Sequence, residues 1–201
     1  MDKSEFDNLN YKKEYESLVT NKNGHKVKRK LVTKSKYVKE LEKDIEFKYK
    51  EKILFQKLNN KGKTAICIGY NPAKSCEDID ITNKRLIECL WEDYDGYELV
   101  NLYPQVSSDK TTCINDLDEN YNFINVIVDI IENDEKDIIL FWGRTLSLSD
   151  ELYNAICNRL DKHLTLKMTT HNNKFTHPGA NSAIEIKKCS KENLKTSHNI
   201  E

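Results

Sequence analysis

The stretch Thr64–Pro72, TAICIGYNP, decides the fold class of this chain. Residues 64–70 form a continuous apolar run, which is typical of a strand that is buried on both faces of a parallel sheet. Gly69 to Pro72 then end that run with turn-forming and rigid residues. The stretch therefore predicts a central strand whose carboxyl end carries polar and conformationally restricted residues.

Strand and helix patterns alternate after this stretch. ELVNLY, DIILFW and a later apolar segment predict further strands, and apolar residues at helical spacing predict helices between them. The expected strands are 64–70, 98–103, 137–142 and 163–168, and the expected helices are 82–91, 120–131 and 149–160. Such alternation implies an α/β fold, a three-layer domain in which a mostly parallel central sheet is flanked by helices.

The residues before this pattern are interpreted as an extension. Alternating apolar residues over 48–58, followed by the turn signal NNKG at 59–62, predict a β-hairpin with the strand 64–70. Segment 35–45 predicts a short amphipathic helix. We therefore divide the chain into a basic, partly helical or flexible extension (1–47), an α/β domain (48–186) and a polar tail (187–201).

The two parts of the chain differ strongly in charge. Residues 1–63 carry 18 basic and 10 acidic side chains and the rest carry 14 and 23, so that +8 and −9 give a net charge of −1. One interpretation is a cationic arm that contacts the phosphates of a nucleic acid. The other is that the lysines only keep the extension soluble, and the charge leaves both open.

Composition excludes several classes of protein. The chain of 201 residues is 38% hydrophobic and 32% charged, with a mean hydropathy of −0.73. It has no run of ~18 apolar residues that could span a membrane, and residues 1–10 lack the apolar core of a signal peptide. We therefore expect a soluble, cytoplasmic protein that has no membrane partner.

Metal, disulfide and nucleotide-loop signals are weak or missing. The six cysteines are spread without a CxxC pair, and no His or Cys pair has the spacing of zinc ligands. The sequence contains no P-loop, no dinucleotide-binding GxGxxG and no GxSxG nucleophile motif. We expect neither a metal nor another cofactor.

Rigid and polar residues follow each expected parallel strand, at the edge where ligands bind in open α/β sheets. All three prolines and three of the six glycines fall there, in GYNP (69–72), NLYP (101–104), WGR (142–144) and THPG (176–179). Each segment alone is typical of an ordinary loop. Four such ends at one edge of a sheet favour a shared pocket.

The order of these motifs resembles the DUF1643 family, a family of domains of unknown function. The motifs are GYNPAKS (69–75), Asp80-Ile81-Thr82, VNLYP (100–104), ILFWG (139–143) and His177-Pro178, and the resemblance covers roughly residues 48–186. The chain departs from the family where the expected NPS reads Asn71-Pro72-Ala73, so that the hydroxyl beside the proline is missing.

The same order also resembles the uracil-DNA glycosylase superfamily, which implies its fold and a hydrolase of N-glycosidic bonds. The resemblance implies two catalytic residues, Asn71 to position water and His177 to donate to the departing base. Asn101 would bind the base edge, and Tyr70 or Tyr103 would stack on the base. The other expected substrate-binding residues are Pro72, Trp142, Gly143 and Arg144, and possible phosphate contacts are Lys74, Arg85 and Lys110.

These residue types suit that chemistry. Cleavage builds negative charge on the base, which a neutral histidine donor stabilises as an oxyanion hole does. An asparagine amide offers a donor and an acceptor that match the edge of a base. An asparagine is a poor general base, so slow hydrolysis is expected from Asn71. The expected partner is a nucleic acid or a small molecule that contains a nucleobase.

Other features favour a non-catalytic module on the same fold. The loop HPGAN (177–181) lacks the leucine with which glycosylases hold an extruded base. Glu77, Asp78 and Asp80 would repel phosphate, unless they cap the helix that begins near Thr82. The alternative is therefore a module that binds a nucleobase, a nucleic acid or a protein, and the oligomeric state is left open.

Overall fold

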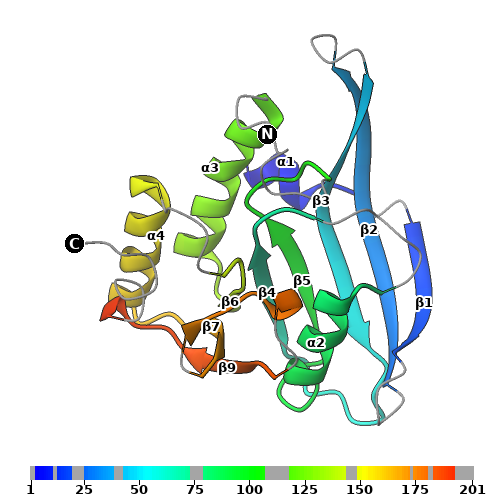
Figure 1. Cartoon of the computed structure of the whole chain (residues 1–201), viewed down its shortest axis with the longest axis vertical. Coiled ribbons are helices and arrows are strands. Elements are labelled where there is room, and N and C mark those ends of the chain that lie inside the picture. The colour runs from blue at the N-terminus through cyan, green and yellow to red at the C-terminus, as the bar shows by residue number, and fades with distance from the viewer. Residues whose placement is uncertain are drawn as a thin grey trace.

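The computed structural model describes residues 3–10, 13–19, 25–38, 43–72, 79–106, 118–143, 149–172, 174–180 and 183–192 (Figure 1). Their helices are α1 (Lys3–Asp7), α2 (Ile81–Leu90), α3 (Asp118–Asn133), α4 (Asp150–Asp161) and the short 3-10 helix η3 (Pro178–Ala180). Their strands are β1 (Lys13–Val19), β2 (His25–Val38), β3 (Lys43–Phe55), β4 (Thr64–Gly69), β5 (Gly96–Asn101), β6 (Asp137–Leu140), β7 (Leu166–His171), β8 (Lys174–Phe175) and β9 (Glu185–Lys188).

The strands form one mixed sheet, so the α/β class is confirmed. Within the described residues the order is β1-β2-β3-β5-β4-β6-β7-β8, and β9 also pairs with β7. The strands expected from the alternating pattern, β4 to β7, pair in parallel. The other pairings are antiparallel, so the prediction of a mostly parallel sheet is wrong.

The antiparallel part comes mainly from the N-terminal wing, which we define as β1, β2 and β3. The helix predicted over 35–45 is wrong, because β2 continues to Val38 and β3 begins at Lys43. The predicted hairpin of 48–58 with 64–70 is also wrong, because β5 lies between β3 and β4 and pairs with both. Pairing between strands overrides the local pattern in both cases.

Helices cover both faces of the parallel section, with α2 on one face and α3 and α4 on the other (Figure 1). Alternate residues of β4 divide between the two sides, as the geometry of a strand requires. Ala65 and Cys67 pack with α2, whereas Ile66 and Ile68 pack with α3 and α4. We call the first side the α2 face.

A bulge in β3 decides which of its side chains reach the α2 face. Consecutive residues of β2 pair with Lys50 and then with Lys48, so Tyr49 is an extra residue. In a regular strand Lys48 and Glu51, three apart, would lie on opposite faces. Across the bulge they share the α2 face and form an ion pair, while Tyr49 packs in the core on the other side.

A buried arginine joins α3 to α4. Arg159 of α4 is fully buried, and its Nε donates to the carbonyl of Thr165 at 3.0 Å. Its Nη1 donates to Ile131 and Asp134 at 2.9 and 2.8 Å, and its Nη2 donates to Lys136 at 2.6 Å. The last carbonyls of a helix have no partner within the helix, so this arginine completes the end of α3. We call these contacts the Arg159 clamp.

Ion pairs connect the lysine-rich first part of the chain with the acidic remainder. Lys52 pairs with Glu98 at 3.5 Å and Lys63 pairs with Asp137 at 2.8 Å. Burial raises the pKa of Asp137, but hydrogen bonds and charge from Lys63 and a hydrogen bond from Tyr94 outweigh burial and lower the pKa of Asp137 to about 2. Part of the charge asymmetry is therefore balanced inside the molecule.

Among the described helices, none combines the length and the apolar character that crossing a membrane would require.

Candidate functional site

The carboxyl ends of β4, β5 and β6 bring three side-chain positions into contact. A Cβ on Gly69 would lie 2.5 Å from Oδ1 of Asn101 and 2.5 Å from the ring of Phe141. No larger residue fits at position 69 unless these side chains move. We call Gly69, Asn101, Phe141, Gly143 and His177 the carboxyl-end cluster.

Asn101 carries an unusual polar group. Its side chain is 3% exposed, and its Nδ2 has no hydrogen-bond partner among the described residues. Buried polar atoms in proteins are nearly always hydrogen-bonded, so an exception calls for an explanation. A ligand that accepts a hydrogen bond at this strand end would supply the partner.

His177 approaches the same strand ends from the loop after β8. Its ring lies 5.8 Å from the ring of Phe141, centroid to centroid. Gly143 has a φ of +82°, and a Cβ there would lie 3.0 Å from the backbone nitrogen of His177. The chain that leaves β6 passes this histidine closely because residue 143 is a glycine.

A hydrogen bond also sets the tautomer of His177. The backbone N–H of Gly179 donates to Nδ1 of His177 at 3.0 Å. Because Nδ1 accepts, the neutral ring carries its proton on Nε2. The histidine is therefore a hydrogen-bond donor at Nε2, which is the form that the glycosylase resemblance requires of it.

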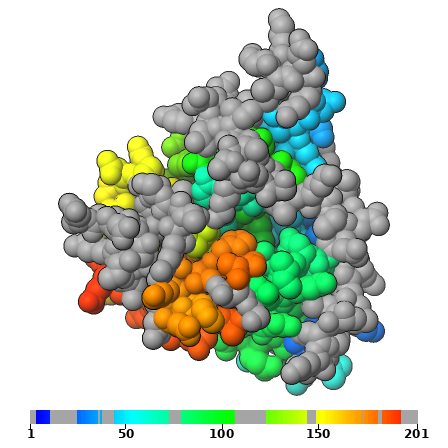
Figure 2. Space-filling model, viewed as in Figure 1, coloured from blue at the N-terminus to red at the C-terminus, as the bar shows by residue number. Residues whose placement is uncertain are grey.

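The first turns of α2 hold the histidine loop, and Figure 2 shows η3 (orange) against α2 (green). Arg85, predicted as a phosphate contact, donates from Nη1 to the carbonyl of Pro178. A Cβ on Gly179 would lie 3.3 Å from Oγ1 of Thr82. The carboxylate of Asp80 accepts from the N–H of Asn83 at 2.7 Å, which confirms Asp80 as the helix cap.

The other predicted residues are placed as follows. The rings of Tyr70 and Tyr103 lie 5.1 Å apart and pack against the core on the α3 side, whereas Asn101 faces α2. Trp142 is fully buried on the α3 side, edge-on to a phenylalanine, so it is a core residue. Asn71 is half-buried and Pro72 is buried, directly after β4. Lys74, Lys110 and Arg144 lie outside the described residues.

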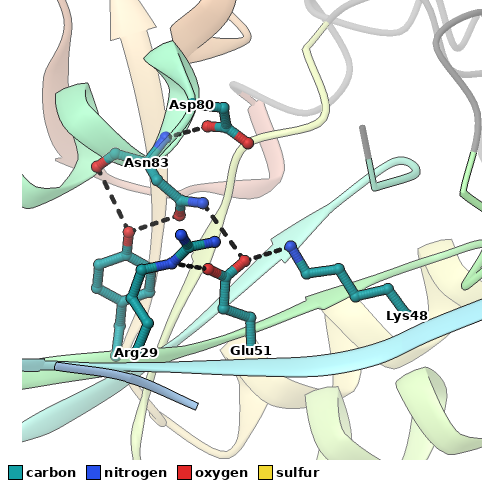
Figure 3. Close-up of polar contacts among 6 residues, drawn as sticks. Arg29, Lys48, Glu51, Asp80 and Asn83 are labelled. Atoms are coloured by element: carbon teal, nitrogen blue, oxygen red, sulfur yellow. Dashed lines mark hydrogen bonds and ion pairs between the residues drawn. The ribbon is translucent and has the colours of Figure 1, made fainter. Parts of the chain in front are cut away.

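Sequence reasoning missed a buried group of three charged and two neutral polar side chains on the α2 face (Figure 3). We call it the Glu51 cluster: Arg29, Lys48, Glu51, Asn83 and Tyr97. Nε of Arg29 lies 2.7 Å from Oε1 of Glu51, and Lys48 forms an ion pair with Oε2. Asn83 donates to Oε2 at 3.4 Å and accepts from the hydroxyl of Tyr97 at 2.7 Å.

The cluster holds its carboxylate in the charged form. Burial raises the pKa of Glu51, but the charges and hydrogen bonds of Lys48 and Arg29 outweigh burial and lower the pKa of Glu51 below its ordinary value. Burial raises the pKa of Tyr97 well above its ordinary value, so its hydroxyl stays a donor to Asn83. One ionised carboxylate is thus shared by two buried cations.

The two clusters meet under the first turn of α2. Tyr97 bonds to α2, and side chains alternate along β5, so Asn101 faces the same side. Thr82 lies against the histidine loop while the next residue, Asn83, bonds to Glu51. Among the described residues, no group of three His, Cys, Asp or Glu side chains could hold a metal ion.

One comparison with known proteins gives a match. A family model described as a protein of unknown function (DUF1643) matches residues 53–179, which include β4 to β8 and the whole carboxyl-end cluster. Most of the N-terminal wing precedes the matched region. No curated protein and no solved structure matches the chain.

Proposed function

The chain belongs to the DUF1643 family, and we propose that its carboxyl-end cluster binds a nucleobase and hydrolyses the N-glycosidic bond of that base. The observation that carries the proposal is the carboxamide of Asn101, which is buried without a partner for Nδ2 among the described residues. His177 belongs to the same cluster, and because its Nδ1 accepts from Gly179, Nε2 is the donor of its neutral ring. The order of the glycosylase-like motifs supports it, and the proposal includes a glycosylase-like arrangement of the parallel section.

In this proposal Asn101 recognises the base. A carboxamide presents a donor and an acceptor side by side, which matches the paired polar atoms on the edge of a base. Such a two-point contact discriminates between bases by about 1–3 kcal/mol. Binding would also give Nδ2 the partner that it lacks among the described residues.

The reaction breaks the bond between the sugar carbon C1′ and the base nitrogen. The electron pair leaves with the base, and His177 donates from Nε2 to a base oxygen, which stabilises the negative charge. Water, held by Asn71, adds to C1′, and its proton passes to the base or to solvent. The products are the free base and a sugar hydroxyl, and the rate is low because an amide cannot accept the proton of water.

Single-turnover assays on nucleosides and on oligonucleotides with deaminated bases test the proposal. We expect release of the base by the wild type and its loss in Asn71→Ala and His177→Ala. Asn133→Ala, at an exposed position at the end of α3, is the matched control and keeps activity. Asn101→Ala loses affinity for the base, measured by calorimetry.

Two results contradict the proposal in different ways. Binding of a base that depends on Asn101, with no cleavage over the whole panel, contradicts the hydrolase and supports a binding module. An unchanged affinity in Asn101→Ala contradicts the assignment of the base site.

A further inference from the structure

The Glu51 cluster contains more buried positive charge than buried negative charge. The side chains of Arg29 and Lys48 are 2% and 6% exposed, and that of Glu51 is 0% exposed. Arg29 uses Oε1 of the carboxylate and Lys48 uses Oε2. Removing a charge from water is costly unless opposite charge or hydrogen bonds offset it.

Lys48 has unused hydrogen-bonding capacity. An ammonium group has three N–H donors, and within the described part of the chain Oε2 of Glu51 is the acceptor that Lys48 contacts with its side chain. Asp80, the other acid in Figure 3, caps α2 and makes no ion pair with Lys48 or Arg29 among the described residues. Counted over the described residues, the side chains of the cluster sum to one positive charge, which an anion would balance.

The position of Lys48 relates it to the carboxyl-end cluster. Its backbone N–H donates to the carbonyl of Pro104 at 2.8 Å, so Lys48 lies beside the chain that has just left β5. Asn101, the last residue of β5, faces the same side of the sheet. Neighbouring strands lie ~5 Å apart, so one ligand can reach both residues.

We propose that Lys48 binds the phosphate group of the ligand whose base contacts Asn101. The substrate is then a nucleotide, either free or within a strand, and not a free base or nucleoside. An ammonium with open donors suits a phosphate oxygen, because hydrogen bonds between ionised groups are short and strong. The substrate class rests on the proposed function, whereas the phosphate contact rests on the Glu51 cluster alone.

Calorimetric titrations of the full chain test this contact, with inorganic phosphate, a nucleoside, its 5′-monophosphate and a single-stranded oligonucleotide as probes. We expect the monophosphate to bind at least tenfold more tightly than the nucleoside. Lys48→Met removes that difference. Lys48→Gln, which keeps a hydrogen bond to Glu51 without the charge, serves if the methionine variant does not fold by circular dichroism.

Lys50→Met is the matched control. Lys50 is also a buried lysine of β3, but it lies on the other face and donates to the carbonyl of Phe6 at 3.0 Å. This variant keeps the tenfold difference. A comparison of the monophosphate with the oligonucleotide shows whether the phosphate belongs to a free nucleotide or to a strand.

Equal affinity for nucleoside and monophosphate in the wild type, or an undiminished difference in both Lys48 variants, overturns the inference and leaves base binding by Asn101 intact. Binding of inorganic phosphate that depends on Lys48, without binding of any base, supports the phosphate contact and contradicts the proposed function.

Discussion

The Arg159 clamp and the Glu51 cluster both bury cations, but they treat the positive charge differently. Arg159 donates to four backbone carbonyls and forms no ion pair within the described residues, although the charges of Asp134 and Asp137 act on it. In the Glu51 cluster two cations share one carboxylate, and Lys48 keeps open donors within the described residues. A buried cation whose donors are used up supports the fold, whereas one with open donors is suited to a ligand.

The two regions also lie at opposite ends of the parallel strands. Lys136 and Thr165, which bind Arg159, directly precede β6 and β7 and thus mark their amino ends. Lys48 lies beside the carboxyl end of β5. Ligands bind at carboxyl ends in open α/β sheets, so the position and the bonding of each cation agree.

The largest expected effect comes from Arg159→Met. Four carbonyls lose a buried donor, and each unsatisfied group costs about 1–3 kcal/mol, so we expect a loss of roughly 3–5 kcal/mol in the free energy of unfolding. Urea denaturation measures it. The affinity ratio of nucleotide to nucleoside stays unchanged at a temperature where the variant is folded. A loss below about 1 kcal/mol would show that the clamp is not structural.

Glu51→Gln comes next, with an expected loss of about 3 kcal/mol at neutral pH, because two buried cations lose their counter-charge. The pKa of Glu51 is lowered in the folded protein, so its stabilisation is present above the ordinary pKa of a glutamate and is lost as the pH falls below it. Urea titrations at pH 7 and pH 3.5 should show the variant and the wild type converging in acid. Parallel pH dependences would contradict an ionised Glu51.

Asp137→Asn tests whether exposure weakens an ion pair in the same chain. Its partner Lys63 is 49% exposed, so solvent screening limits the expected loss to about 1 kcal/mol. Since the folded pKa is lowered to about 2, the contribution is present above the ordinary pKa of an aspartate and disappears as the pH falls toward 2. A loss as large as that expected for Glu51→Gln would show that burial does not explain the difference between the two ion pairs.

The smallest expected change in stability belongs to Lys48→Met. Removal of this cation leaves Arg29 and Glu51 as a balanced pair, so the free energy of unfolding changes by less than about 1 kcal/mol. The same variant loses the preference for nucleotide over nucleoside. A large loss of stability with intact binding would make Lys48 a second structural cation, like Arg159.

The sequence predicts the parallel section well, because its strands are local apolar runs and its helices have regular spacing. The ends are less exact: the strand expected over 163–168 is Leu166–His171, because His163, with a φ of +57°, still belongs to the turn that ends α4. The wing was mispredicted because the segment expected as a helix belongs to two strands that pair with each other, and because β3 also pairs with β5, which is distant in sequence.

The candidate site divides in the same way. Asn101, Gly143 and His177 stand at strand ends that the pattern reveals, and the fold brings the glycine against the histidine. The Glu51 cluster has no comparable signal, because Lys48 and Glu51 look like solvated charges in a lysine-rich strand. Their burial depends on packing against α2 and on the bulge in the pairing with β2, and both involve residues that are distant in sequence.

That bulge makes the spacing of two residues as important as their identity. Tyr49 shifts the alternation of β3 by half a period, so every residue before it has exchanged faces relative to an uninterrupted strand. A relative with one residue fewer at this point and no bulge would carry the equivalent lysine two residues before the glutamate, so the two would still share the α2 face. A relative that keeps the three-residue spacing in a strand without a bulge would instead turn the lysine toward α3, so spacing and bulge have to be compared together when relatives are aligned.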